Sequence, residues 1–204
     1  MTYKIRLIIV FGSLWLLTAA AGALAGETLS AAETRKLNTF FSNFSEARMA
    51  RFTPVSLSDE ALLSFAMKHN YINNFKSLKQ STDQLSVLVP ATLIDRTTTK
   101  YFGRTLHAHS GAPYSVLMAD GEPLPFSQIR TLTALDDHRY QADGLVYLPG
   151  GPDPIDIHAN PNIWNKDGVE VETIGRFTAI IKKETTDGGE RWILTEYAVI
   201  EGTP

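Results

Sequence analysis

A single apolar stripe marks the first amphipathic segment of the chain, at Leu37, Phe40, Phe41 and Phe44. These positions have the i, i+3, i+4, i+7 spacing of one helix face. Ser30 and Glu33 precede the stripe in the S-x-x-E order of a capping box, in which the serine caps the first turn and the glutamate reaches back to it. The pattern predicts a helix whose aromatic face packs on a large partner, and a β-sheet is the obvious one.

A second helical pattern, residues 58–75, changes from apolar to polar halfway along. Ser58 is the predicted N-cap, and Asp59 and Glu60 follow where the helix dipole favours carboxylates. A stripe that becomes polar while its period persists either leaves the core or lines a cavity. The positions on this face are Leu62, Phe65, Ala66, His69, Ile72 and Asn73.

The remaining chain is richer in strand patterns. Alternation predicts a strand at 85–89, and residues 90–103 predict a helix that begins at Pro90 and ends at Gly103, although β-branched residues 97–99 disfavour it. Pro149 to Asn165 holds four prolines and predicts a surface loop without regular structure. From Leu106 onward, period-two patterns predict strands at 106–110, 114–118, 127–135, 139–148, 169–183 and 191–200. The last of these is apolar on both faces, which predicts a central position in its sheet.

Helices first and antiparallel strands afterwards is the α+β pattern, with N-terminal helices packed on one face of a curved antiparallel sheet. The element order is similar to that of nuclear-transport-factor-2-like and cystatin-like cones, which enclose a pocket between helices and sheet. We expect one such domain over residues 26–204.

The N-terminal residues indicate export. Lys4 and Arg6 precede an apolar run at 7–17, and small residues follow up to Ala23-Leu24-Ala25. This order predicts a secretory signal peptide over residues 1–25, cleaved after Ala25, and hence a periplasmic or secreted protein. The alternative is an uncleaved membrane anchor. The Ala- and Gly-rich second half of the run favours cleavage.

Composition excludes several classes of function. The chain has no cysteine, so disulfides, thiol catalysis and cysteine metal sites are excluded. It carries 19 basic and 22 acidic side chains, and loss of Lys4 and Arg6 leaves a formal charge of −5. A mildly acidic surface without a basic block argues against nucleic acid or, after signal cleavage, a membrane as partner.

Three short motifs resemble an uncharacterised family of exported bacterial proteins, often lipoproteins. They are LNTFFSNFSEA at 37–47, HNYINNF at 69–75 and KYFG at 100–103. The lipid-bearing cysteine of such lipoproteins is missing here, so a membrane tether is not implied. The resemblance implies no activity and no cofactor.

The candidate ligand-binding residues are His69, Tyr71, Asn73 and Trp164. His69, Asn73 and Tyr71 present donors and acceptors at the polar end of the second helix. The structural alternative is a histidine satisfied by the backbone, with Asn73 or Asn74 ending the helix in a left-handed conformation. Trp164 either stacks on a sugar or peptide, or pins its loop to the domain.

His107 and His109 give a weaker metal alternative. An i, i+2 spacing on a strand points both imidazoles to one face, but a metal needs a third ligand. The candidates for that ligand, His138, His158 and Asp156, have no recognisable spacing, and solvated histidines are the simpler interpretation.

The sequence therefore favours a non-enzymatic binding domain for a small molecule, glycan or peptide, with no cofactor and a pocket between the second helix and the sheet. Catalytic motifs of hydrolases, zinc proteases and nucleotide-binding loops are missing. An envelope hydrolase using histidine with a carboxylate is the first alternative. A structural or protein-interaction module, marked by a flat exposed apolar patch, is the second.

Overall fold

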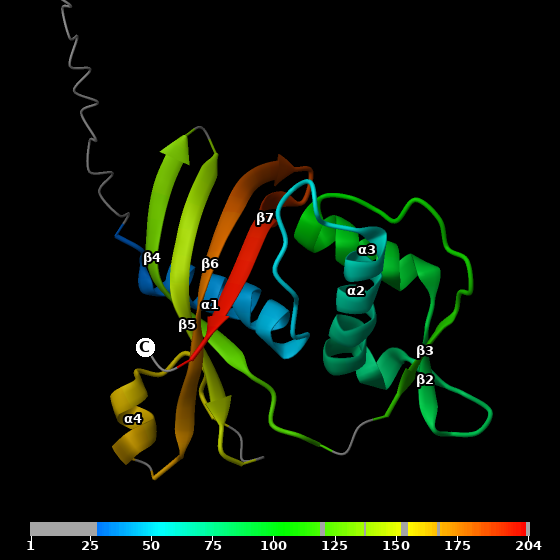
Figure 1. Cartoon of the computed structure of the whole chain (residues 1–204), viewed down its shortest axis with the longest axis horizontal. Coiled ribbons are helices and arrows are strands. Elements are labelled where there is room, and N and C mark those ends of the chain that lie inside the picture. Colours follow the sequence, from blue (N-terminus) through cyan, green and yellow to red (C-terminus); the bar gives the residue numbers. More distant parts are fainter. Residues whose placement is uncertain (1–27, 119–120, 137, 152–154, 167, 203–204) are drawn as a thin grey trace, which may run out of the picture.

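The computed structural model describes residues 28–118, 121–136, 138–151, 155–166 and 168–202 (Figure 1). The predicted signal peptide lies outside the described residues. The α+β class is confirmed. The helices are α1 (Ala31–Glu46), α2 (Asp59–Asn74), the 3₁₀ turn η1 (Phe75–Ser77), α3 (Ala91–Phe102) and α4 (Pro161–Lys166).

The strands of the described chain form two antiparallel sheets, where the sequence predicted one. The larger sheet has the order β4-β5-β6-β7 and the smaller β1-β2-β3. They are separate because β3 pairs with β2, with Val116 opposite Val87, and β4 pairs only with β5. The strands are β1 (Lys79–Gln80), β2 (Ser86–Val89), β3 (Tyr114–Leu117), β4 (Phe126–Asp136), β5 (Arg139–Pro149), β6 (Val171–Thr186) and β7 (Gly189–Glu201).

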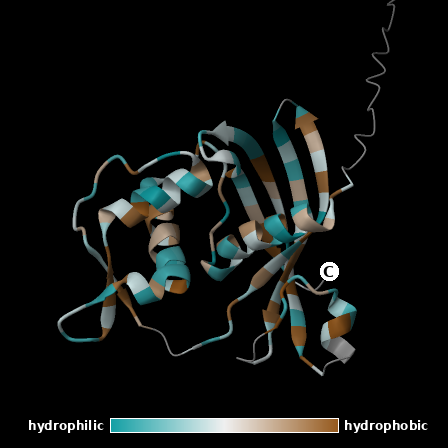
Figure 2. Ribbon diagram, turned by 180° about the vertical axis from the view of Figure 1, so that it is seen from behind, coloured by the Kyte–Doolittle hydropathy of each residue, from teal (hydrophilic) through white to brown (hydrophobic). Residues whose placement is uncertain are grey.

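Helix α1 crosses one face of the larger sheet, as its aromatic stripe predicts (Figure 1). The capping box is formed: Glu33 N–H donates to the Ser30 hydroxyl, and the Glu33 carboxylate accepts from Ser30 N–H at 3.0 Å. Phe41 packs on Phe177 of β6, with ring centroids 4.5 Å apart. Hydrophobic and hydrophilic positions alternate along the strands beneath it (Figure 2), so one face of the sheet supplies the core.

Each outer strand of the larger sheet has part of its edge hydrogen-bonded by another segment. On β4, the Ser42 hydroxyl accepts from Ser127 N–H at 3.1 Å, and Asn38 Oδ1 accepts from Ile129 N–H at 2.9 Å. On β7, Tyr197 exchanges backbone hydrogen bonds of 2.9 and 3.1 Å with Phe52. The predicted central position of the last strand is therefore wrong. Within the described residues, β7 pairs with β6 on one edge and bridges to Phe52 on the other, and its apolar side chains pack on α1 and α3.

Helices α2 and α3 pack together on one side of the larger sheet, next to the smaller sheet (Figure 1). Phe65 of α2 stacks on Phe44 of α1 at 5.0 Å and meets Phe102 of α3 edge-on at 5.1 Å. Gly103 ends α3 with φ of 69°, in the left-handed conformation that glycine adopts without penalty. This aromatic cluster fixes the three helices around a common point, and the candidate site lies above it.

Two further predictions are wrong. Residues 106–110 form a loop and not a strand, because His107 and His109 bind carboxylates on two helices and Leu106 alone is buried. The Pro-rich stretch contains the short helix α4, which begins at Pro161, a residue suited to the first turn of a helix.

Candidate functional site

An open cleft of about 420 Å³ lies where α1, α2 and α3 meet. The sequence predicted a pocket beside His69, and this cleft is there. The sequence predicted that the sheet would form the wall opposite α2. Instead α1 and α3 form it, and none of the lining residues that the structure describes comes from a sheet. They are Thr39, Asn43, His69, Asn70, Asn73, Asn74, Ser77, Leu93, Arg96, Thr97, Lys100 and Tyr101.

His69 lies at the inner wall of the cleft and is 7% exposed. Its ring is parallel to Phe65, 5.7 Å away, and edge-on to Tyr101 at 4.9 Å. Asn73 Nδ2 lies 3.2 Å from His69 Nδ1. Since the amide nitrogen donates, Nδ1 accepts and the neutral ring carries its proton on Nε2. Burial, with a smaller effect of the Lys100 charge, lowers the pKa of His69 to about 4.

The asparagines of α2 hold side chains together instead of ending the helix. Asn74 Nδ2 donates to Asn70 Oδ1, one turn earlier on the same helix, at 2.9 Å. Neither Asn73 nor Asn74 is left-handed, so this part of the structural alternative is wrong: the chain passes from Asn74 through right-handed Phe75 into η1. Asn73 donates across to Asn43 Oδ1 on α1 at 3.5 Å, which links two walls of the cleft.

Glu46, the last residue of α1, is a candidate that the sequence analysis missed. Its side chain is largely buried, and Oε2 has no hydrogen-bond partner among the described atoms. Burial raises the pKa of Glu46 to about 7, although a hydrogen bond from Asn73 opposes this. Burial, and to a lesser degree the charge of Glu46, raises the pKa of Tyr101 above its usual range. Near neutral pH, therefore, the Glu46 carboxyl group beside the cleft titrates, while the His69 and Tyr101 rings that line it are uncharged.

Arg96 and Lys100 give the outer wall a positive charge. They are exposed one turn apart on α3, and neither has an ion-pair partner within the described ranges. The lysine Nζ lies 4.7 Å from the centroid of the Tyr101 ring. Asp95, the nearest carboxylate in sequence, binds His109 instead. The described lining thus has two cations and no carboxylate, which suits an anion.

Two predicted ligand-binding residues lie away from the cleft. Tyr71 packs edge-on to Phe75 at 5.5 Å and is not among the lining residues described above. Trp164 of α4 is 4% exposed and meets the rings of Phe126 and Tyr147 edge-on. Its indole N–H donates to the Asp156 carbonyl at 3.0 Å. It pins the loop to the domain, which is the second of the two roles that the sequence left open.

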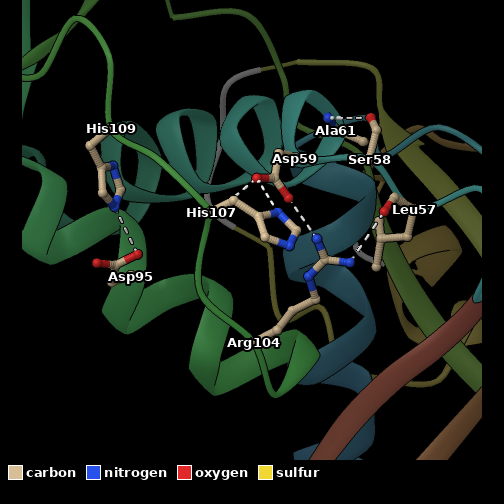
Figure 3. Close-up of polar contacts among 8 residues, drawn as sticks. All are labelled: Leu57, Ser58, Asp59, Ala61, Asp95, Arg104, His107 and His109. Carbon is tan, nitrogen blue, oxygen red and sulfur yellow. Dashed lines mark hydrogen bonds and ion pairs between the residues drawn. The ribbon is translucent and has the colours of Figure 1, made fainter.

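His107 and His109 bind separate partners, as Figure 3 shows. Asp59 accepts from His107 N–H at 2.8 Å, lies 2.8 Å from its Nδ1, and accepts from Arg104 Nη2 at 2.6 Å. His109 Nε2 lies 2.9 Å from Asp95 Oδ1. These contacts fasten the loop after α3 to the first turn of α2 and to the second turn of α3. Since the loop is no strand, the reason to place both imidazoles on one face is lost.

No three His, Asp or Glu side chains of the described chain stand close enough to hold a metal ion. The candidate third ligands His138, His158 and Asp156 do not join His107 and His109. Asp156 instead accepts from the His158 backbone N–H at 2.9 Å, a local turn contact.

No helix within the described residues combines the length and apolar character needed to cross a membrane. Comparisons of the chain with protein-family models, curated proteins and solved structures find no match. The resemblance to exported bacterial proteins therefore rests on the three quoted motifs alone.

Proposed function

We propose that this protein is an exported, periplasmic or secreted, non-enzymatic binding domain that holds a small anionic molecule in the cleft between α1, α2 and α3. The observation that carries the proposal is the position of Arg96 and Lys100, which have no carboxylate partner among the described residues, beside a row of side-chain amides in a concave site. The volume of about 420 Å³ lies in the range of small-molecule sites.

The charge arrangement favours an anion over a neutral ligand. Like charges at i, i+4 on a helix repel by a few tenths of a kcal/mol, about 0.2–0.5. An anion between Arg96 and Lys100 removes that repulsion. The arginine can bind a carboxylate or phosphate through two parallel N–H groups, while the lysine acts as a point charge.

The amides supply the neutral part of the recognition. Asn73 and Asn74 are exposed at the other wall, and the Ser77 side chain lies at the end of the cleft. An amide carries both donor and acceptor groups, so this wall can bind hydroxyl, amine or amide groups of a ligand. A sugar acid, an amino acid or a short peptide with a free carboxylate has this combination of groups.

The proposal is tested by thermal unfolding with a panel of small carboxylates and phosphates. A true ligand at a hundred times its Kd stabilises the folded state by about 2.7 kcal/mol. We expect the Arg96→Gln/Lys100→Gln double variant to lose this stabilisation. Lys68→Gln, which removes an exposed cation of α2 outside the cleft, is the matched control. Stabilisation that persists in the double variant, or is lost in the control, contradicts the proposal.

Acid–base catalysis in the same cleft is the second candidate function. It is favoured by Glu46, whose pKa of about 7 suits a group that exchanges protons near neutral pH, and which is hydrogen-bonded to Asn73 of the lining. Binding is preferred because Glu46 is not among the cleft-lining residues described above. The His107–Asp59 and His109–Asp95 pairs, the histidine–carboxylate contacts that a hydrolase would use, are not among the lining residues of this cleft either. Turnover of an ester or glycoside substrate that Glu46→Gln abolishes would favour catalysis.

A further inference from the structure

A second, apolar hollow of about 500 Å³ adjoins the polar cleft at the junction of β2 and α3. Ser77 and Leu93 line both spaces, so the two are neighbouring lobes. The walls of the second lobe are mainly aliphatic. They are formed by Leu88, Pro90, Ala91, Leu93, Ala112 and Pro113, with Lys79 at the rim.

Helix α3 lines both lobes, and its lining side chains change from apolar to cationic along its length. Ala91 and Leu93 face the apolar lobe, and Arg96 and Lys100 face the polar cleft. At 1.5 Å per residue, Ala91 and Lys100 are about 14 Å apart along the helix axis. A ligand lying along α3 thus meets an apolar surface at one end and two cations at the other.

We propose that the ligand is a monomeric amphiphile, with an anionic head group held by Arg96 and Lys100 and an unbranched apolar tail lying in the lobe at the β2–α3 junction. This inference rests on the proposed function, because it places the head group in the same cleft. Charge complementarity selects the head. The aliphatic lobe that adjoins the cleft favours an apolar tail, since burying a methylene contributes about 0.8 kcal/mol.

The test uses titration calorimetry of the purified protein with butanoate, octanoate, decanoate and decanol, each kept monomeric. We expect the Kd to fall by about fourfold for each added methylene until the lobe is filled. Decanol lacks the charge and should bind at least about tenfold more weakly than decanoate. The Arg96→Gln/Lys100→Gln variant should bind decanoate no better than decanol.

A substitution in the apolar lobe distinguishes the contribution of the tail to binding from that of the head group. Ala91→Gln places a neutral polar side chain in the lobe at the first position of α3, where glutamine is tolerated. It should raise the Kd of decanoate about tenfold and change that of butanoate by less than about twofold. Thr92→Gln is the matched control, because Thr92 is the next residue, is exposed and lines neither lobe. Ala112→Gln enters the same lobe from the opposite wall and serves as the second variant if Ala91→Gln does not fold.

The outcomes distinguish the two proposals. If butanoate binds through Arg96 and Lys100 and longer chains bind no better, the amphiphile inference is wrong while the anion site stands. If decanol and decanoate bind equally, the head-group assignment is wrong. If none of these alkyl carboxylates binds at any length, the amphiphile inference is wrong, and the panel of small carboxylates and phosphates decides separately whether the anion site stands. Binding to anionic vesicles without binding to monomeric decanoate also overturns the inference, because it points to a membrane surface.

Discussion

The Asn70 side-chain amide donates a hydrogen bond to the Thr97 hydroxyl, 2.9 Å away, and so fastens α2 to α3 beneath the cleft. Both residues are buried, and the same Asn70 nitrogen also donates to the Ala66 carbonyl at 2.8 Å. A buried amide with all these partners is costly to remove, because the remaining groups lose their hydrogen bonds without gaining water.

We therefore expect Asn70→Ala to lower the free energy of unfolding by about 2–3 kcal/mol, and Thr97→Val by about 1–2 kcal/mol. The double variant should lose less than the sum of the two, because they share one contact. Urea denaturation measures all three. Asn74→Ala, which removes an exposed amide that also contacts Asn70, should cost less than about 1 kcal/mol. Equal losses for Asn70→Ala and Asn74→Ala would contradict this view of the α2–α3 contact.

Glu46 makes the stability of the fold depend on pH. Its pKa rises from the usual 4.5 to about 7 on folding, so the folded state holds the proton more tightly. Stability contributed by the protonated form is present below pH 4.5 and is lost as the pH rises to about 7. Glu46→Gln cannot ionise. We expect its stability relative to the wild type to increase by about 1–2 kcal/mol between pH 5 and 8, allowing for partial exposure.

His69 acts in the opposite direction and must be separated from Glu46. Its pKa falls from 6.5 to about 4 on folding, so its contribution is present above pH 6.5 and is lost as the pH falls toward 4. Comparing Glu46→Gln with the wild type cancels this effect, because both proteins contain His69. Urea titrations at each pH give the difference, and Glu60→Gln, at an exposed position of α2, is the control. A difference that does not change with pH would exclude a buried titrating Glu46.

Asp59 should control the order of the loop after α3. Its carboxylate binds Arg104 Nη2, His107 N–H and His107 Nδ1 (Figure 3). We expect Asp59→Ala to speed amide hydrogen exchange across residues 104–110, because the loop loses its attachment to α2. Glu60→Ala is the matched control: it also removes a first-turn carboxylate, yet it leaves these three contacts intact. Equal exchange in both variants would mean that the helix dipole, and not the contacts, sets the effect.

The proposed export is tested at the N-terminus. Expression of the full chain in a bacterial host should give a periplasmic or secreted protein whose mass and first residue correspond to Gly26. Ala25→Asp should block processing, because the cleavage site needs a small residue. A processed protein that begins elsewhere, or full-length protein retained in the membrane, would favour the anchor alternative.

Much of the helical part of the fold could be predicted from local chemistry. The Ser30–Glu33 capping box, the Ser58 N-cap and the Gly103 end of α3 each satisfy backbone groups within one or two turns, so their signals lie close together in the sequence. Helix α3 forms despite its run of threonines because Thr97 and Thr98 are buried, and packing outweighs their intrinsic preference.

The strands and the site depend on contacts between distant residues. The alternation of His107 and His109 resembles a strand, but their partners are Asp59 and Asp95, 48 and 14 residues away. Likewise, β7 looks central from its apolar faces, but within the described chain its outer edge meets the distant residue Phe52 and not another strand.

The polar end of α2 identified one wall of the cleft, through His69 and Asn73. Glu46 and Arg96 carry no signal of their own, since a single charged residue on a helix is usually solvated. Only the approach of α1 and α3 to α2 brings Glu46 to Asn73 and places Arg96 in the same cleft as His69.

The hydrogen bonds that α1 makes to β4, and that Phe52 makes to β7, also affect how molecules meet in concentrated solution. Fibrils with strands perpendicular to their axis grow when an incoming chain pairs with unsatisfied backbone at the rim of a sheet. At Ser127, Ile129 and Tyr197 that backbone is already satisfied from within the same molecule. Polymerisation through these positions therefore has to wait until α1 or the Phe52 segment detaches, which makes partial unfolding the step that limits it.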